Sequence, residues 1–456
     1  MHKLRVQFLG AAGTVTGSKI YLETSELRVL IDCGVFQGTK EVRERNWNPL
    51  PIDVSRIDIV LLTHGHLDHT GYLPRLLKEG FQGKIMGTGP TLAIAEIILK
   101  DSAKIHEEEA LKANEEGYSR HKPALPFYSL EEAAKAIRTF EKVQKDQWIS
   151  LSPHSKVRFL YGGHILGATH IEMDIFEKRF VFSGDLGRIK DPLLYPPQVP
   201  KWADFVFVES TYGHKLHPTA DTDAVLAALI HRTVNARGNL IIPAFAVERL
   251  QTVMFRLWQL YRKNRIPKIQ IVVDSPMGQN VLAVFEQYPE WHKLDAQEYK
   301  AMCAHFRMVS SYKETWEVID DPRPKIVIAG SGMVTGGRVL TYLQQWMGKS
   351  STHILLVGYQ AEGTRGRQLQ EGAHELKIFG KYYPVKAEIT ELQGLSAHAD
   401  QEELLQWLGA IQNTPEKVFL LHGEPTALES FRVKIRDTFH WPVVIPAYGE
   451  TVDIWL

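Results

Sequence analysis

The feature that most constrains this chain is a cluster of metal-binding side chains directly after an apolar run. Residues 63–70 read Thr-His-Gly-His-Leu-Asp-His-Thr, and the apolar run before them, Ile57 to Leu62, predicts a buried strand. In an extended segment, His64 and His66 project to one side, while Asp68 and His69 can turn to another. Two such pairs of imidazole and carboxylate ligands suit two adjacent zinc-like ions better than one. The alternative is a polar loop whose histidines only form hydrogen bonds.

Histidine or aspartate also follows the predicted ends of other strands. These residues are Asp32 after Arg28–Ile31, His164 after Val157–Gly163, Asp185 after Arg179–Gly184, and His422 after Lys417–Leu421. Because the carboxyl ends of strands in layered α/β proteins converge on an open crevice, we expect these side chains to meet at one site. For His164 taken alone, a satisfied buried polar residue is the simpler interpretation, but the repeated pattern favours a shared site.

The motifs resemble those of the metallo-β-lactamase superfamily. This resemblance rests on the cluster at 64–69 together with Asp32, His164 and Asp185. Three further stretches resemble its β-CASP branch of RNA-processing nucleases, which includes RNase J and the polyadenylation-complex endonuclease. They are Val206 to Gly213, Gly394 to Asp400, and Leu421 to Glu424. The motifs occur in the order of that branch and extend over nearly the whole chain.

The resemblance implies an α/β protein, a metallo-β-lactamase αββα sandwich with an inserted parallel α/β (β-CASP) cap domain. The sequence agrees, because short β-rich segments give way to helix–strand alternation and then return. We expect the sandwich over 1–208 and 377–456, the insertion over 209–376, and the substrate in the cleft between them. Within the first part, Ser129 and Glu132 predict a capping box that opens a helix running towards Lys142.

The composition is that of a globular protein of a reducing compartment. Apolar residues make up 44% and charged residues 23%, and Cys33 and Cys303 are too few for a disulfide framework. No apolar run reaches the roughly 18 residues of a membrane span. We therefore expect a cytoplasmic protein that does not contact a membrane. Lys plus Arg equals Asp plus Glu, 53 each, so any basic surface for nucleic acid must be local.

The resemblance implies a role for each residue of the site. His64, His66 and His164 would bind one ion, Asp68, His69 and His422 the other, Asp185 would bridge them, and Asp32 would orient the ligands. We expect two Zn²⁺ per chain, with Mn²⁺ as the alternative. Such a pair, about 3.5–4 Å apart, would lower the pKa of a shared water and supply hydroxide at neutral pH. His398 would protonate the departing oxygen, with Glu209 holding its imidazole.

In the β-CASP branch, a histidine at the last motif accompanies RNA substrates, so His422 indicates RNA. The predicted function is a ribonuclease that cuts single-stranded RNA, as an endonuclease or a 5′ exonuclease, in RNA processing or decay. The contacts expected with RNA come from Ser331, Gly332, Arg338 and Ser396. For the glycine-rich segment from Gly330 to Arg338, a tight structural turn is the alternative.

The other functions left open are a DNA-acting nuclease of the same branch, a small-molecule hydrolase of the wider superfamily, and a non-catalytic RNA-binding scaffold subunit. The filled ligand positions speak against the scaffold, and the large insertion speaks against the small-molecule hydrolase. The oligomeric state, including a homodimer, stays open.

Overall fold

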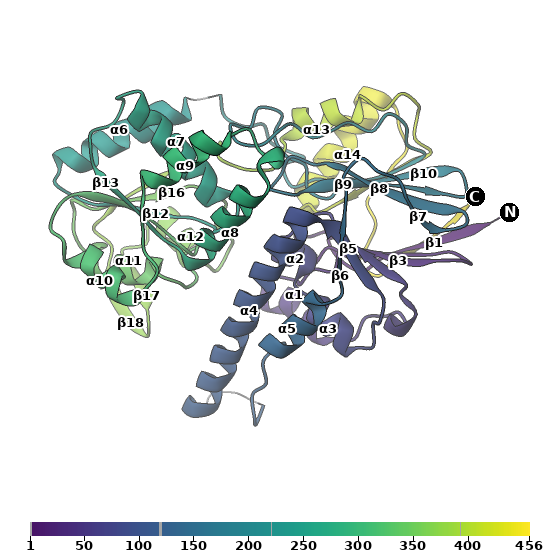
Figure 1. Cartoon of the computed structure of the whole chain (residues 1–456), viewed down its shortest axis with the longest axis horizontal. Helices are drawn as coiled ribbons and strands as arrows, with labels where there is room; N and C mark the ends of the chain where they lie inside the picture. Colours follow the sequence, from purple (N-terminus) through teal and green to yellow (C-terminus); the bar gives the residue numbers. More distant parts are fainter. Residues whose placement is uncertain (1, 118–120, 220, 393) are drawn as a thin grey trace. The chain divides into compact units, whose positions relative to one another are not determined.

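The structure is a computed structural model, and it describes residues 2–117, 121–219, 221–392 and 394–456. The chain divides into two compact units. Unit 1 consists of Met1–Leu216 and His398–Leu456, and unit 2 is His217–Ala397. Figure 1 labels the elements of both units. None of the described helices combines the length and the apolar character that a membrane span requires.

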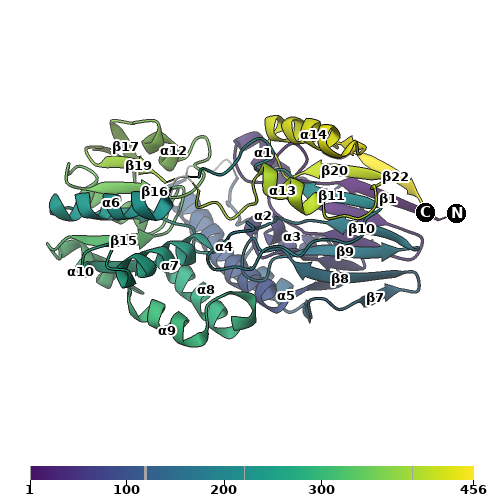
Figure 2. The ribbon, with the colours of Figure 1, turned by 90° about the horizontal axis from the view of Figure 1, so that it is seen from above.

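Unit 1 contains two mixed sheets. In spatial order the first sheet is β22 (Thr451–Trp455), β1 (Lys3–Phe8), β2 (Ile20–Glu23), β3 (Arg28–Ile31), β4 (Ile59–Leu61), β5 (Lys84–Thr88) and β6 (Phe140–Val143). The second is β21 (Val443–Val444), β20 (Lys417–Leu421), β11 (Phe205–Glu209), β10 (Lys178–Phe182), β9 (Thr169–Ile175), β8 (Ser155–Tyr161) and β7 (Ile149–Ser152). Figure 2 shows β1 beside β22, with which it pairs antiparallel.

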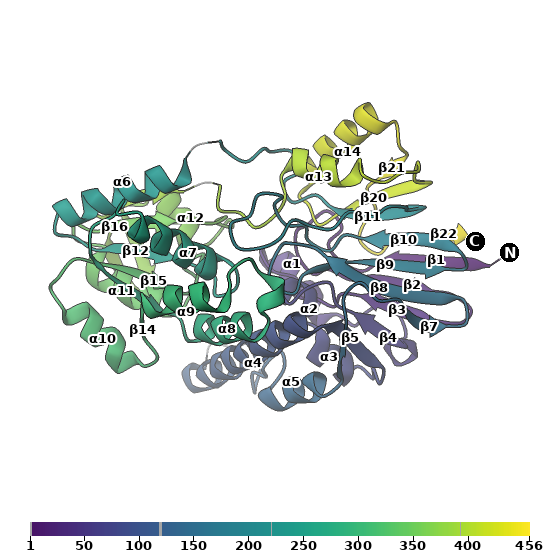
Figure 3. The same ribbon diagram turned by 45° about the horizontal axis from the view of Figure 1, so that its top comes forward.

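Helices cover the outer faces of the two sheets (Figure 1). Those that belong to the first sheet are α1 (Lys40–Glu44), α2 (Leu67–Thr70), α3 (Leu73–Lys78), α4 (Gly89–Glu116) and α5 (Leu130–Ile137), while α13 (Gln401–Leu408) and α14 (Pro425–Phe439) belong to the second. Short 3₁₀ turns occur at η1 (Arg45–Trp47) and η2 (Val54–Arg56). Figure 3 shows α4 running beside α5.

The alternation of buried residues along the strands explains these layers. Side chains such as Phe8 and Phe419 point between the two sheets and form one core. The opposite face of β4, with Val60, packs against α3, and the opposite face of β11, with Val208, packs against α13 and α14. Each sheet therefore packs against the other sheet on one face and against helices on the opposite face. This layering of helices, two sheets and helices is the αββα arrangement.

Unit 2 is built on a parallel sheet. Its strands in spatial order are β14 (Arg307–Met308), β13 (Gln270–Asp274), β15 (Lys325–Ala329), β12 (Leu240–Pro243), β16 (His353–Leu356) and β19 (Glu388–Glu391). Its helices are α6 (Thr222–Asn235), α7 (Arg249–Arg262), α8 (Pro276–Gln287), α9 (Ala296–Ala304), α10 (Tyr312–Asp320), α11 (Val339–Trp346) and α12 (Arg365–Gln370), with a 3₁₀ turn η3 (Pro289–Trp291). Figure 1 shows α7 on one side of the strands and α11 on the other.

One local expectation needs correction, and the compact units divide the chain at a position other than one expected boundary. The capping box at Ser129 and Glu132 forms, but the helix ends at Ile137 rather than near Lys142, because residues 140–143 pair with β5 as β6. The predicted boundary at 376 also differs from the compact units. Residues 377–397 belong to unit 2, because β19 extends its sheet beside β16, and β18 (Lys381–Pro384) forms a hairpin with β17 (Glu375–Ile378).

Candidate metal centre

The histidine and aspartate side chains that follow the strands of unit 1 lie together in two groups. One group is His64, His66, His164 and Asp185, and the other is Asp68, His69 and His422. Within each group, one nitrogen or oxygen of every residue lies within 4.8 Å of those of the others. Residues far apart in the sequence therefore form one polar cluster inside an apolar fold.

Imidazole nitrogens face one another in the first group. His66 Nδ1 lies 3.1 Å from His64 Nε2 and 3.3 Å from His164 Nε2. Asp185 Oδ2 lies 3.6 Å from His64 Nε2 and 3.7 Å from His164 Nε2. Four potential ligand atoms thus surround a small space, a geometry that a single ion can satisfy.

The second group has the same character. His422 Nε2 lies 3.3 Å from both His69 Nε2 and Asp68 Oδ2. Asp185 approaches this group with its other oxygen, since Oδ1 lies 3.5 Å from His69 Nε2 and 3.4 Å from His422 Nδ1. Asp185 therefore presents one carboxylate oxygen to each group.

The backbone at the strand ends turns sharply to deliver these side chains. Asp32 after β3 and His422 after β20 both adopt positive φ, at 58° and 48°. Gly184 has φ 53°, and a Cβ at this position would lie 2.6 Å from Thr63 Cβ. Only glycine therefore allows the backbone before Asp185 to lie this close to Thr63. Non-glycine residues with positive φ are uncommon, and such strain is often found at functional sites.

Asp32 and Thr63 hold two of the imidazole rings. Asp32 Oδ2 lies 2.7 Å from His69 Nδ1 and accepts a 2.8 Å hydrogen bond from the Thr63 hydroxyl. The Thr63 hydroxyl also lies 3.1 Å from His64 Nδ1. A ring whose Nδ1 hydrogen is engaged in this way presents the lone pair of Nε2 to a metal ion.

Thr211 orients the ring of His422 in the same way. Its hydroxyl lies 3.2 Å from His422 Nδ1 and donates to the His422 carbonyl oxygen, also at 3.2 Å. Sequence reasoning missed both Thr63 and Thr211. The signal was present, because Thr63 and Thr211 both lie within the motifs quoted from the sequence, but the residue that each hydroxyl contacts depends on the fold.

The donor set fits divalent metal ions. Burial and the neighbouring histidines hold the pKa of His64 well below its usual value, and burial lowers the pKa of His66 to about 4, so both rings are neutral at pH 7. Burial would raise the pKa of Asp68, but His69 and His422 hold it below its usual range. Asp185 Oδ1 is buried and accepts no hydrogen bond from a described residue. Burial disfavours the charged ring of His69, but the surrounding carboxylates outweigh this effect and raise its pKa to about 10, so a metal ion would take the place of that proton. Imidazoles and carboxylates are zinc-type ligands, and a cation would satisfy the Asp185 oxygen.

A histidine–glutamate pair borders the cluster. His398 Nδ1 lies 3.2 Å from both carboxylate oxygens of Glu209 and 4.0 Å from Asp185 Oδ2. Burial disfavours the charged ring, but the Glu209 carboxylate outweighs this effect and raises the pKa of His398 to about 9. The imidazole therefore keeps both of its protons at neutral pH, and Glu209 stays ionised beside it.

The residues expected to contact RNA lie in unit 2. The Ser331 hydroxyl accepts hydrogen bonds from the backbone N–H groups of Thr335 and Gly336, so it closes its own loop. A Cβ at Gly332 would lie 2.7 Å from the Phe245 ring. Ser396 precedes His398 by two positions.

Arg338 is already engaged within unit 2. Its Nη1 donates to Asp274 at 3.0 Å and to the Thr315 hydroxyl at 2.6 Å, and its guanidinium lies 4.1 Å from the centre of the Tyr312 ring. Asp274 is fully buried. Pairing with a phosphate would therefore compete with a buried ion pair.

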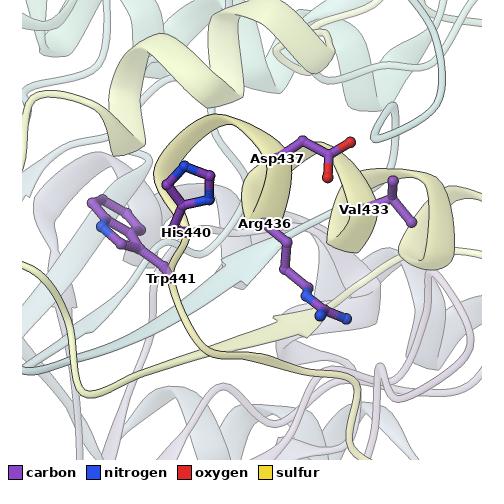
Figure 4. A pocket seen from close by; sticks show the side chains of 5 residues that line it. All are labelled: Val433, Arg436, Asp437, His440 and Trp441. Carbon is purple, nitrogen blue, oxygen red and sulfur yellow. The ribbon is translucent and has the colours of Figure 1, made fainter.

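A surface hollow of about 490 Å³ opens beside the C-terminal part of α14 (Figure 4). Val433, Arg436, Asp437, His440 and Trp441 line it. None of these residues belongs to the histidine–aspartate cluster, so the hollow supplies no part of that chemistry.

Family models match three stretches of the chain. Residues 13–233 match the metallo-beta-lactamase superfamily, 250–369 the Beta-Casp domain, and 382–446 the Zn-dependent metallo-hydrolase RNA specificity domain. Together these matches include every residue of the cluster.

Two relatives and one solved structure extend the comparison. Ribonuclease TTHA0252 of Thermus thermophilus is 33% identical over 99% of this chain and 100% of its own length. Transcription termination factor FttA of Methanocaldococcus jannaschii is 28% identical over 99% of this chain and 72% of its own length. A crystal structure of a protein of unknown function from Enterococcus faecalis matches 99% of this chain and 100% of its own with a TM-score of 0.55. At 14% identity, that likeness concerns the fold alone.

Proposed function

Because this chain belongs to the metallo-β-lactamase superfamily and to its β-CASP branch of RNA-processing nucleases, we propose that it is a metal-dependent ribonuclease acting on single-stranded RNA. The observation that carries the proposal is the buried cluster of histidine and aspartate side chains, in which ligand atoms face one another at 3.1–3.7 Å. The name of the Thermus relative and the RNA specificity domain supply the substrate class.

We assign His64, His66 and His164 to one ion and Asp68, His69 and His422 to the other, with Asp185 between them. The ions proposed are zinc, two per chain, with manganese as the alternative, because imidazoles and carboxylates suit both. When bound, such a pair supplies an activated water and neutralises the phosphate oxygens. Asp32, Thr63 and Thr211 orient the histidines that surround the ions.

His398 is the proposed general acid. Its Nδ1–H faces the Glu209 carboxylate, so the proton on Nε2 is the one available for the departing oxygen of the RNA strand. Glu209 also accepts from the backbone N–H of Leu186 at 2.7 Å, which fixes the carboxylate and through it the ring. The chain thus supplies its own proton donor, and no serine or cysteine nucleophile is required.

Ser331, Gly332, Arg338 and Ser396 stay proposed contacts with the RNA strand, in unit 2. The DNA-acting alternative is not favoured, because the last motif carries His422 and its segment matches the RNA specificity domain. The scaffold alternative is not favoured either, because all of the ligand side chains are in place.

The test uses unstructured RNA labelled at either end, with DNA of matching sequence, incubated with metal-loaded protein. Shortening from the 5′ end and internal cutting give different product lengths, so the same experiment separates the two modes. We expect RNA but not DNA to be cut. His398→Ala should lower turnover by roughly 10²- to 10⁴-fold while metal content stays at the wild-type level.

The matched control is His154→Ala, an exposed histidine of unit 1 whose ring contacts Glu26 and Phe176 and no residue of the cluster, so it should leave turnover unchanged. Metal-loaded protein that leaves RNA intact would contradict the proposal. Full turnover by His398→Ala would contradict the assignment of the general acid alone.

A further inference from the structure

A group of unneutralised cations lies on the surface of unit 2. Because the chain has equal numbers of basic and acidic residues, any region that attracts RNA phosphates must be local. Arg365, Lys377 and Lys381 have no carboxylate within ion-pair distance among the described residues, whereas the neighbouring Arg367 pairs with Glu371 at 2.7 Å. Together with Phe379 and Tyr382, these three cations form what we call the hairpin patch.

The hairpin itself is a rigid support. β17 and β18 pair antiparallel, and the buried Leu376 and Ile378 anchor one face of the hairpin in the core of unit 2. The other face carries Lys377 opposite Tyr382, with the ammonium 5.6 Å from the ring centre. Tyr382 is 62% exposed, so its ring is available to a ligand. Figure 2 shows β17 beside α12.

The turn of the hairpin carries an unusual residue. Ile378 pairs with Lys381 across a two-residue loop, Phe379-Gly380, in which φ is 48° and 82°. Turns with two positive φ values prefer Asn-Gly, and a bulky residue at the first position is strained. Phe379 is 65% exposed, so packing does not compensate for this strain. A strained and exposed aromatic ring at a hairpin tip points to binding rather than to stability.

A hollow of about 250 Å³ adjoins the hairpin. Thr335, Gly363, Thr364, Arg365, Gln368 and Lys377 line it. Arg365 Nε donates to the Lys377 carbonyl oxygen at 2.6 Å, and its Nη1 donates to the Thr335 carbonyl oxygen at 3.1 Å. Because carbonyl oxygens are neutral, these bonds fix the guanidinium beside the hollow without cancelling its charge. The hollow therefore suits an anionic group.

We propose that the hairpin patch binds single-stranded RNA, with a phosphate in the hollow between Arg365 and Lys377 and with bases stacked on Tyr382 and Phe379. Basic side chains that follow the backbone, together with exposed rings, are how proteins hold unpaired strands. A duplex keeps its bases stacked inside and leaves the rings without a partner. The inference rests on the proposed function for the choice of RNA, but the patch is separate from the metal ligands, which all belong to unit 1.

The test is the binding of a fluorescein-labelled oligouridylate to the full chain in EDTA, followed by fluorescence anisotropy, so that no cleavage occurs. Phe379→Asn removes the ring and relieves the backbone strain, because Asn tolerates positive φ. Tyr382→Thr also removes a ring, and threonine is a residue that β-strands favour, so β18 should still form. Each should weaken binding about 5- to 100-fold. Lys377→Gln with Lys381→Gln should reduce the slope of log K against log salt concentration by about 0.7 for each phosphate contact that is lost, and so by about 1.4 if each lysine contacts its own phosphate.

The control is the double variant Lys300→Gln with Lys313→Gln, which removes two exposed lysines of α9 and α10. It should bind as the wild type does. Melting temperatures show whether each variant is folded, and the melting temperature of Phe379→Asn should equal or exceed that of the wild type. Unchanged affinity in the folded aromatic variants would overturn the inference, and so would equal affinity of the wild type for duplex RNA.

Hydrolysis of bis(p-nitrophenyl) phosphate by the metal-loaded wild type separates this inference from the proposed function. This small diester has no bases to stack, so it reports on the metal centre alone. If RNA binding depends on the hairpin patch while the small diester and RNA both stay intact, the proposed function fails and the inference stands. If RNA is cut while the patch variants bind it normally, the inference fails and the proposed function stands.

Discussion

At the residue scale, threonine hydroxyls decide which ring nitrogens of His64 and His422 remain free to bind the proposed ions. The Thr211 hydroxyl donates its one proton to the His422 carbonyl, so it accepts from His422 Nδ1–H and leaves Nε2 to face His69 and Asp68. Thr63 acts likewise between Asp32 and His64. Such partners fix both the tautomer and the orientation of a metal-binding ring.

Thr211→Val should therefore lower the affinity for the second ion by about 10- to 100-fold, because the isosteric side chain cannot accept the Nδ1 hydrogen. Metal content after dialysis against a weak chelator should fall towards half of the wild-type value. Thr211→Ser keeps the hydroxyl and should restore it. A Thr211→Val protein that retains wild-type metal content would contradict this role.

Lys19 gives the stability a specific pH dependence. Its side chain is fully buried and donates to the carbonyl oxygens of Gly17 and Gly34, and burial lowers the pKa of its ammonium from 10.5 to about 8. Below pH 8 the folded and unfolded states both carry the proton, and the folded state bears the whole cost of the buried charge. Between pH 8 and 10.5 only the unfolded state keeps it, so the contribution of Lys19 to the free energy of unfolding should rise with pH, by about 3 kcal/mol at most.

Urea unfolding at a series of pH values measures this rise. Lys19→Met should lose that part of the pH dependence, and Lys300→Met, at an exposed site, should keep it. Parallel curves for wild type and Lys19→Met would show that the Lys19 proton is not the cause.

At the element scale, the strands bring distant ligands together through their packing. β20 ends at Leu421, just before His422, and it lies beside β11, which ends at Glu209. Phe419 of β20 stacks on Phe207 of β11 at 4.7 Å between ring centres and contacts Phe8 of the first sheet at 5.4 Å. The position of His422 therefore depends on the core between the sheets.

Phe419→Ala should destabilise unit 1 by about 3–5 kcal/mol, because a fully buried ring leaves a cavity. Urea unfolding followed by circular dichroism measures the loss, and Phe419→Leu should cost clearly less. A loss below about 1 kcal/mol for the alanine variant would mean that β20 is not held by this contact.

At the scale of the whole molecule, unit 2 is an insertion whose two ends lie close together. A Cβ at Gly394 would lie 3.5 Å from the Thr222 hydroxyl and 3.7 Å from Pro218 Cγ. Each unit has its own apolar core, and the proposed metal ligands among the described residues all belong to unit 1. Ligand binding stabilises the folded state of the unit that binds, and a unit that unfolds separately gains no stability from it.

Removal of the ions should accordingly lower the melting temperature of unit 1 and leave that of unit 2 unchanged. At an ion concentration 1,000 times the dissociation constant, each ion contributes about 4 kcal/mol, which corresponds to a fall of roughly 10 °C or more. Calorimetry with and without EDTA measures it, and Phe419→Ala identifies the transition of unit 1. Equal shifts of both transitions, or none, would contradict this division.

The sequence by itself determined the local chemistry: the ligand-type side chains after apolar strands, the capping box at Ser129, and the family motifs that include Glu209 and His398. These features depend on neighbours within a few positions, so periodicity and motif spacing reveal them. Only the tertiary structure decided that β6 replaces the end of a helix and that residues 377–397 join unit 2. It also decided that Arg338 donates to Asp274, and that the hydroxyls of Thr63 and Thr211 orient histidine rings. Each of these rests on pairing or packing between residues distant in the chain, and the free energy of such contacts outweighs local preference.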